Sequence, residues 1–207
     1  MILFVCEGNV CRSPLAAGIL ARSLELHEID LSITSAGTQA LVGEPMDVAT
    51  ALIATRFGVD PTIHRARQLT TEPVANARLT LVASRRIRRA VVALYPPAVQ
   101  YTFTIRQFGR LMATAGEELV TNGSSSESKV EAVRTFAARH RGMQIPPDPS
   151  ADDVIDPHGR PSSVHELAAR QMAPALGYLS IALGGQLLRA GVNGHAHRHT
   201  WKHRSAR

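Results

Sequence analysis

The sequence is poor in cysteine and has no long apolar run. Cys6 and Cys11 are its only two cysteines in 207 residues. So few thiols make a structural disulfide framework implausible and exclude a zinc site built from four thiolates. No apolar segment is long enough to cross a bilayer, and no charged segment with a small-residue cleavage site precedes the apolar run that begins at Ile2. We therefore expect a cytoplasmic protein, kept in a reducing compartment, that does not bind a membrane.

The C-terminal end of the chain lacks acidic residues, so most of the net positive charge lies there. The formal net charge is +6, yet no acidic residue follows Glu166. Five positive charges stand near the end of the chain: Arg189, Arg198, Lys202, Arg204 and Arg207. The rest of the chain is close to neutral, so the high isoelectric point indicates a basic tail and gives no reason to expect binding to nucleic acid.

A strand, a turn and a helix are predicted in succession at the N-terminus. Residues 1–5 are apolar, residues 6–12 include glycine and polar side chains, and Ser13 and Pro14 precede apolar residues at helical spacing. The loop of such a βα unit can point successive backbone N–H groups into one hollow, at the positive end of the helix, where a phosphate binds. A Walker loop is excluded because its Gly-Lys-Ser/Thr is missing.

Three side chains of this loop carry the predicted chemistry. Cys6 ends the strand, where N–H groups and the helix dipole stabilise a thiolate nucleophile. Arg12 can hold two equatorial oxygens of a phosphoryl group with its planar guanidinium. Ser13 can donate a hydrogen bond to the sulfur and so help it leave a phosphocysteine. A lone cysteine is more often a buried small side chain, and a lone arginine a solvated charge, but their combination indicates phosphoryl transfer.

The other residues of the loop are predicted to surround the bound phosphate. They are Glu7, Gly8, Asn9, Val10 and Cys11. Gly8 is expected to adopt a positive φ, and the Asn9 amide is expected to fix the loop from within. Cys11 either packs beneath the loop or captures an oxidised Cys6 as a disulfide, and the sequence leaves both interpretations open.

The run Cys-Glu-Gly-Asn-Val-Cys-Arg-Ser-Pro at residues 6–14 resembles the phosphate loop of the low-molecular-weight protein tyrosine phosphatase family. The resemblance implies a single three-layer α/β domain of the phosphotyrosine protein phosphatase I type, with a four-stranded parallel sheet flanked by helices. It implies hydrolysis of a tyrosine-phosphorylated protein through a phosphocysteine intermediate, by a monomer that uses no cofactor and no metal. By this resemblance the catalytic residues are Cys6, Arg12 and an acid supplied from elsewhere in the chain.

Two further segments match elements of the same family. Residues 35–38 read Ser-Ala-Gly-Thr, which implies that Ser35 hydrogen-bonds the loop through Asn9; otherwise Ser35 is a solvated turn residue. Residues 64–70 match an element that braces the phosphate loop in the family, so His64 is assigned a supporting role. After the strand expected at 79–83, the sequence departs from the family and places four arginines that either attract an acidic substrate or coat a helix start: Arg85, Arg86, Arg88 and Arg89.

Asp156 is the expected general acid, because a phosphate monoester needs its leaving oxygen protonated. Asp156-Pro-His158 resembles the family's Asp-Pro-Tyr loop, and Ser163 and Glu166 have the spacing of a capping box that anchors it. Asp148 also precedes proline but is expected to be a turn residue. His158 stands where relatives have an aromatic residue, and its imidazole stacks less well on a substrate ring while adding a pH-dependent charge.

The remaining segments complete one domain over residues 1–190. Further strands are expected at 31–35 and 98–104, and helices at 13–27, 48–57, 105–119, 130–136 and 167–183. Residues from about 109 to 151 form an insertion relative to compact members of the family, with a flexible linker at 122–126. The tail at 191–207, with its alternating histidines, could bind a divalent metal or a polyanion, but its lack of apolar residues favours disorder.

Two other functions remain open at this stage. An arsenate reductase also begins with a thiolate attacking an oxyanion, but it would have to borrow external small thiols because no cysteine follows Cys11. A catalytically silent phosphate-binding adaptor could use the basic tail to bind nucleic acid or an anionic partner. The presence of Cys6, Arg12 and Asp156 together argues against the adaptor, because binding alone needs no acid.

Overall fold

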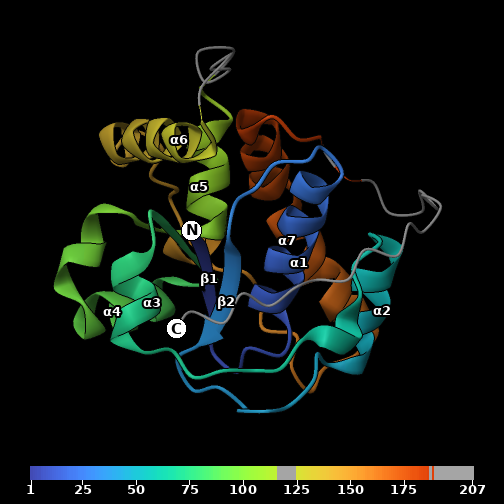
Figure 1. The fold of residues 1–207 in the computed structure, drawn as a ribbon. Helices are drawn as coiled ribbons and strands as arrows, with labels where there is room; N and C mark the ends of the chain where they lie inside the picture. The colour runs from blue at the N-terminus through green and yellow to red at the C-terminus, as the bar shows by residue number, and fades with distance from the viewer. Residues whose placement is uncertain (116–124, 187, 189–207) are drawn as a thin grey trace.

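A parallel β-sheet lies at the centre of the structure, a computed structural model that describes residues 1–115, 125–186 and 188 (Figure 1). The sheet has the strand order β2-β1-β3-β4, and all its neighbouring strands are parallel. The strands are β1 (Ile2–Cys6), β2 (Ile33–Gly37), β3 (Leu79–Val82) and β4 (Thr102–Thr104). The predicted four-stranded parallel sheet flanked by helices is confirmed.

The two faces of the sheet are covered by different helices. Ile2 and Phe4 of β1 belong to a core that includes residues of α1 (Arg12–Glu25), α5 (Ile105–Met112) and α7 (Ser162–Leu183). The outer helices α2 (Val48–Arg56) and α6 (Ser126–His140) pack against this layer. Alternate side chains of a strand point to opposite faces, which places Leu3 and Val5 in the second core.

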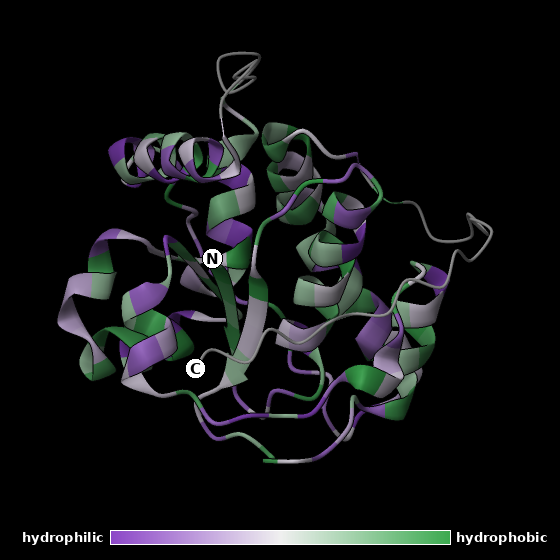
Figure 2. Ribbon diagram, viewed as in Figure 1, coloured by the Kyte–Doolittle hydropathy of each residue, from purple (hydrophilic) through white to green (hydrophobic). Residues whose placement is uncertain are grey.

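The second core lies beneath α3 (Thr71–Asn76) and α4 (Arg85–Leu94). Because both faces of β1 are covered, all five of its residues are buried, and Figure 2 shows the strand as uniformly hydrophobic. The short 3₁₀ helices η1 (Pro61–Ile63), η2 (Pro96–Gln100) and η4 (Pro149–Asp152) lie in the connections. No helix in the described residues is both long and apolar enough to span a bilayer.

Several element boundaries differ from those predicted: the strand expected at 31–35 is β2 at Ile33–Gly37, and the helix expected at 130–136 is α6 at Ser126–His140. The strand expected over 98–104 is wrong in its first half, where η2 replaces it, because Pro96 and Pro97 fix their own φ and donate no ladder hydrogen bond. The helix expected from 105 ends at Met112, and its predicted end at 119 lies outside the described residues. The same holds for most of the linker expected at 122–126 and for the whole tail at 191–207.

The predicted capping box of the last helix is wrong. Helix α7 begins at Ser162, directly after Pro161, and has no side-chain cap. Glu166 instead forms an ion pair with Arg56 at the end of α2. The last helix is therefore joined to α2 by charge, while its buried residues, including Met172 and Leu179, belong to the core that it shares with α1 and α5.

Candidate active site

The candidate site lies at the carboxyl end of β1, the position at which open α/β sheets bind ligands. Cys6 is the last residue of β1, and α1 begins at Arg12. The loop between them is short, so its backbone must turn sharply to enter the helix. Strands β2 and β3 lie on either side of β1, and the segments that follow them reach the same edge.

Polar contacts fix the sulfur of Cys6. Its side chain is only 2% exposed, its Sγ lies 3.0 Å from Ser13 Oγ, and it accepts a hydrogen bond from the Asn9 backbone N–H at 3.3 Å. Ser13 Oγ in turn accepts a hydrogen bond from Asn9 Nδ2 at 2.9 Å. Both neighbours can donate toward the sulfur, an arrangement that stabilises a thiolate.

Asn9 holds the loop together, and it does so more completely than the sequence indicated. Its fully buried amide donates to Ser13 Oγ and to Ser35 Oγ (3.0 Å), and its Oδ1 accepts from the Arg67 N–H at 2.9 Å. The expected hydrogen bond from Asn9 to Ser35 is therefore confirmed. The positive φ expected at Gly8 is wrong, because it occurs at Asn9 (φ 56°), whose type tolerates the left-handed region.

Gly37 lets the end of β2 approach this loop. A Cβ placed on Gly37 would collide with the backbone oxygen of Glu7 and would lie 3.0 Å from the Asn9 N. Only glycine fits such an approach of two backbones. The glycine of the Ser-Ala-Gly-Thr segment therefore serves packing against the loop, while Ser35 supplies the hydrogen bond.

Replacing Asn9 with alanine is expected to lower the free energy of unfolding by about 3 kcal/mol, because three buried hydrogen bonds and a favourable left-handed residue are lost. Urea unfolding followed by circular dichroism measures the change. Asn9→Gly, which tolerates the positive φ but makes no side-chain hydrogen bonds, is the matched comparison and is expected to recover about 1 kcal/mol of the loss. Equal stability of Asn9→Ala and the wild type would contradict this account of the loop.

His64 also supports the loop, from the segment after η1. Its Nε2 lies 2.7 Å from the Asn9 carbonyl oxygen, so the ring donates to the loop backbone. Burial lowers the pKa of His64 below its usual value, and the nearby Arg67 and Arg65 lower it further, against the opposing effect of the Asn9 hydrogen bond. The folded chain therefore favours the neutral ring.

This pKa shift predicts a loss of stability in acid. A histidine whose pKa is lowered by folding takes up a proton more readily in the unfolded chain. Its contribution to the free energy of unfolding is therefore complete above about pH 6.5 and is lost as the pH falls below that value. The His64→Gln variant retains a donor for the Asn9 carbonyl and cannot titrate. We expect its melting temperature to fall less than that of the wild type between pH 7 and pH 5, in thermal scans followed by circular dichroism. Parallel pH profiles of the two proteins would refute the assignment.

Arg12 connects the loop to the segment that carries Asp156. Its Nη2 lies 2.6 Å from Asp156 Oδ2, and its Nη1 donates to the Val154 carbonyl at 3.3 Å. The Arg12 side chain is 6% exposed and that of Asp156 is 42% exposed. Among the described residues, the buried Nε of Arg12 has no hydrogen-bond partner. The two terminal nitrogens of the guanidinium fix it to the segment at 154–156.

A pocket of about 270 Å³ opens above these groups. Cys6, Arg12 and Asp156 line it together, which brings the three predicted catalytic residues to one place. Leu41, 42% exposed, and His158 form part of its wall. The His158 backbone N–H donates to Asp156 Oδ1 at 3.3 Å, so the Asp-Pro-His turn also orients the carboxylate.

Glu7, Gly8, Val10 and Cys11 also line the pocket, and three of these loop residues make further contacts. The carboxylate of Glu7 is paired with Arg86 of α4, which identifies a role for one of the four arginines that depart from the family. Val10 and Cys11 pack with Ala66 in a small apolar cluster. Burial raises the pKa of Cys11 to about 12, so this thiol stays protonated at neutral pH. The packing interpretation of Cys11 is favoured over the capture of an oxidised Cys6, which needs a thiolate.

Several residues near the site were not found from the sequence. Leu41 and Gln39 line the pocket from the segment after β2, and the Val154 carbonyl holds Arg12. Asp47 lies beneath His158, with Oδ2 at 3.9 Å from its Nδ1. Only Asp47 had a usable signal: it precedes a helical pattern, and it caps α2 by accepting the N–H of Ala49 at 3.0 Å.

One group of metal-ligand types occurs beside the pocket. Ligand atoms of Cys11, Asp47 and His158 lie within 4.8 Å of one another in the described part of the chain. Zinc accepts these ligand types, but Cys11 packs in the apolar cluster with Val10 and Ala66, and the Asp47 carboxylate already caps α2. The chemistry proposed below uses none of them as a metal ligand.

Comparisons with known proteins were made by sequence and by structure. The profile of a family described as low molecular weight phosphotyrosine protein phosphatase matches residues 1–136. A probable low molecular weight protein-tyrosine-phosphatase, EpsP of Ralstonia solanacearum, is 38% identical over 104 residues, which is 50% of this chain and 69% of that protein. A protein-arginine-phosphatase of Geobacillus stearothermophilus is 35% identical over 107 residues, which is 52% of this chain and 70% of that protein.

Solved structures give the same result for the fold. The YwlE arginine phosphatase from Geobacillus stearothermophilus superposes with a TM-score of 0.60 at 26% identity, over 88% of this chain and 91% of that chain. The low molecular weight protein tyrosine phosphatase from T. tengcongensis superposes with a TM-score of 0.58 at 27% identity, over 84% of this chain and 93% of that chain.

Proposed function

Because the chain belongs to the low-molecular-weight phosphotyrosine protein phosphatase family, we propose that it hydrolyses phosphotyrosine in proteins through a phosphocysteine intermediate. One observation of the structure carries the proposal: Cys6, Arg12 and Asp156 line a single pocket at the carboxyl end of β1. A phosphate bound there lies within reach of the nucleophile, the guanidinium and the acid. Free, buried cysteines suit a reducing compartment, so we place the reaction in the cytoplasm.

In the first step the Cys6 thiolate attacks phosphorus. The S–P bond forms as the bond from phosphorus to the aryl oxygen breaks. Arg12 and the backbone N–H groups of the loop hold the equatorial oxygens, whose charge they stabilise in the transition state. The Asn9 network keeps these donors in place before the substrate arrives, so little reorganisation is needed.

Asp156 protonates the leaving aryl oxygen. In the unliganded site its carboxylate is held by Arg12 at 2.6 Å, so a substrate phosphate competes with Asp156 for the guanidinium. When the phosphate takes Arg12, Asp156 is released at the mouth of the pocket, on the side from which the leaving group departs. In this pair Asp156 is a carboxylate, so after its release it takes up a proton from solvent and then donates that proton to the leaving oxygen.

In the second step water releases phosphate from Cys6. Asp156, now a carboxylate, takes a proton from the water as its oxygen bonds to phosphorus and the S–P bond breaks. Ser13, 3.0 Å from the sulfur, stabilises the departing thiolate. The cycle returns the enzyme to its starting state, and its products are inorganic phosphate and the free phenol.

The two alternatives raised by the sequence fit less well. Arsenate reduction would need an external thiol to reduce the oxidised Cys6, because Cys11 is protonated at neutral pH and no cysteine follows it. A catalytically silent adaptor needs only to bind phosphate, and the Asp156 carboxylate competes with phosphate for Arg12 without contributing to binding. The relatives described above are phosphatases, which favours hydrolysis over both.

Phosphoarginine is a second candidate substrate, because one relative is named a protein-arginine-phosphatase. The exposed apolar side chain of Leu41 at the pocket wall suits a flat aryl ring better than a charged guanidinium. The test compares kcat/KM for one peptide carrying either phosphotyrosine or phosphoarginine, at neutral pH. We expect the phosphotyrosine peptide to be hydrolysed faster by about ten-fold or more. A preference for phosphoarginine would replace the proposed substrate, and turnover of neither peptide would overturn the proposed reaction.

A further inference from the structure

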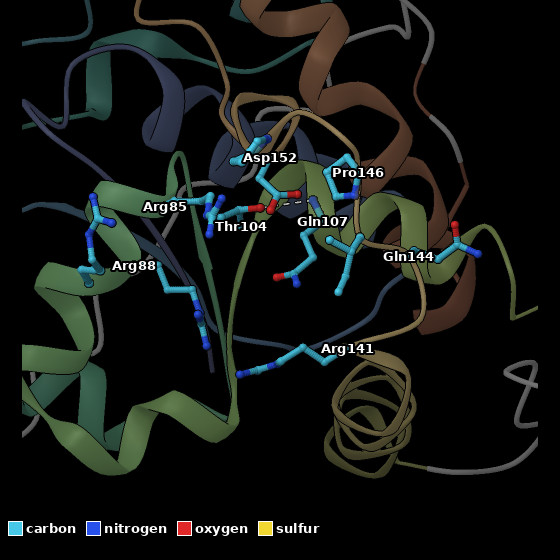
Figure 3. A pocket seen from close by; sticks show the side chains of 11 residues that line it. Arg85, Arg88, Thr104, Gln107, Arg141, Gln144, Pro146 and Asp152 are labelled. Carbon is cyan, nitrogen blue, oxygen red and sulfur yellow. Dashed lines mark hydrogen bonds between the residues drawn. The ribbon is translucent and has the colours of Figure 1, made fainter.

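A second pocket, of about 420 Å³, lies on the other side of the segment that carries Asp156 (Figure 3). Four arginines line it: Arg85, Arg88 and Arg89 from α4, and Arg141 from the end of α6. Its one acidic lining residue, Asp152, is paired with Arg110 of α5. In the described part of the chain, no acidic side chain forms an ion pair with the four arginines. We refer to this cavity as the arginine pocket.

The geometry of α4 makes these charges converge. Residues three and four apart lie on the same face of a helix, so the guanidinium groups of Arg85, Arg88 and Arg89 share one side of α4. Like charges at this spacing destabilise a helix, and positive charges in its first turn oppose the helix dipole. The helix therefore gains nothing from these arginines, whereas an anion bound between them would relieve both unfavourable interactions.

Two of the arginines are held in place by the protein. Arg88 Nε and Arg141 Nη2 both donate to the Thr102 carbonyl, at 3.1 and 3.2 Å. Arg141 also donates to the Val99 carbonyl at 2.6 Å and stacks on the ring of Phe103, with 4.2 Å from guanidinium carbon to ring centroid. Figure 3 shows Arg88 and Arg141 reaching toward each other from opposite walls. These side chains are already ordered, so binding an anion would cost them little conformational entropy.

The charges in the pocket are poorly compensated. Burial lowers the pKa of Arg141 to about 10, and the positive charge of Arg88 contributes to the change. Burial also lowers the pKa of Arg88, and the charge of Arg85 lowers it further, against the opposing effect of Asp152. Both groups remain cationic at neutral pH, but their lowered pKa values show that the charged forms are disfavoured where they stand. A bound anion would reverse this effect.

The wall opposite α4 comes from the segment that the sequence identified as an insertion. Arg141, Gln144, Pro146 and Pro149 lie within residues 109–151. Without this wall, the arginines of α4 would lie on an open helix surface. The insertion thus converts a basic helix face into a concave site, which is the form that small ligands require.

The arginine pocket lies next to the catalytic pocket. Arg85 lines it, and the Arg85 backbone N–H donates to Asp153 Oδ1 at 2.7 Å, three residues before Asp156. The next residue, Arg86, pairs with Glu7 of the phosphate loop. A ligand with two anionic groups could therefore occupy both pockets, with the start of α4 between them.

We propose that the arginine pocket binds a phosphate group, as a second anion site distinct from the one between Cys6 and Arg12. Guanidinium groups bind phosphate oxygens in pairs of parallel hydrogen bonds, and several convergent arginines select for a compact, multiply charged anion. Two sources offer this chemistry: a free small polyphosphate, or a second phosphorylated residue on the protein substrate. The second source rests on the proposed phosphatase function, while the first does not.

The test uses the double variant Arg85→Gln/Arg89→Gln, since these exposed side chains have no described structural partner. The control is Arg139→Gln/Arg170→Gln, which removes the same charge from exposed positions of α6 and α7 outside both pockets. Inorganic tripolyphosphate is titrated by calorimetry into the intact chain, with the catalytic pocket already saturated with vanadate. We expect the Kd to rise by about ten-fold or more in the pocket variant and by less than about two-fold in the control.

A kinetic arm addresses the second source. KM is compared for a peptide with one phosphotyrosine and for the same peptide with an additional phosphoserine. A lower KM for the doubly phosphorylated peptide, lost in the pocket variant and retained in the control, identifies the second phosphate of the substrate as the ligand. Tripolyphosphate binding without this KM effect identifies a free polyphosphate. Equal losses in the two double variants, or no binding together with no KM effect, would overturn the proposal. Because the calorimetric arm needs no turnover, an inactive protein would still test the pocket.

Discussion

Replacing Cys6 with serine is expected to abolish the hydrolysis of aryl phosphates, with kcat falling by about 10⁴-fold or more. A serine hydroxyl in the same position is protonated at neutral pH and attacks phosphorus poorly. The contacts of Arg12 with Val154 and Asp156 do not involve the sulfur. Steady-state assays with p-nitrophenyl phosphate measure the loss, and retained binding of inorganic phosphate by calorimetry shows that the loop is intact.

The two cysteines should also differ in reactivity, which provides an independent check. Since the pKa of Cys11 is about 12, we expect iodoacetamide at neutral pH to modify Cys6 and to leave Cys11 unmodified. Peptide mass mapping of wild type and Cys6→Ser measures this directly. If the kcat of the Cys6→Ser variant lay within ten-fold of the wild-type value, or if iodoacetamide alkylated Cys11 in preference to Cys6, another group would be the nucleophile.

The phosphate loop was predictable because its functional residues lie close together in the sequence. Cys6, Arg12 and Ser13 are fixed relative to one another by a short loop between a strand and a helix, so their spacing carries the geometry. The parallel sheet was predictable for a similar reason, since β1 is buried on both faces and is apolar throughout. Local pattern and local structure agree here.

Contacts between distant segments could not be derived in the same way. The Arg12–Asp156 ion pair and the Glu7–Arg86 pair join residues whose separation along the chain says nothing about their distance in space. The positive φ of the loop was assigned to Gly8 because glycine accepts it most easily, yet the buried hydrogen bonds of Asn9 decide the conformation. Tertiary contacts override local preference at such positions.

The four arginines after β3 illustrate the same limit. From the sequence they either attract an acidic substrate or coat a helix start, and the solvated face is the favoured interpretation. The structure separates them: Arg86 points to the phosphate loop, whereas the other three face the arginine pocket. The wall that encloses this pocket follows α6, more than 40 residues further along the chain, so no local pattern could reveal it.

Replacing Asp156 with asparagine is expected to produce two opposite effects. The variant cannot donate a proton to the leaving group, so kcat for phenyl phosphate or a phosphotyrosine peptide should fall by about 10²- to 10⁴-fold. It also loses the negative charge that holds Arg12 in the unliganded site, so inorganic phosphate should inhibit more strongly. Kinetic assays with phosphate as a competitive inhibitor measure both effects on the same protein.

The choice of leaving group identifies the role of the acid. An activated ester such as 2,4-dinitrophenyl phosphate leaves without protonation, so the first step should be nearly unaffected in the Asp156→Asn variant. Because Asp156 also activates water, the second step becomes slow, and a burst of dinitrophenol should precede the steady state. Asp148→Asn, in which an exposed carboxylate that caps η4 is replaced by another good capping residue, is the matched control and should show neither effect. Equal losses in the rate of the first step for activated and unactivated esters would mean that Asp156 only positions Arg12, and the acid would then have to be sought elsewhere in the pocket.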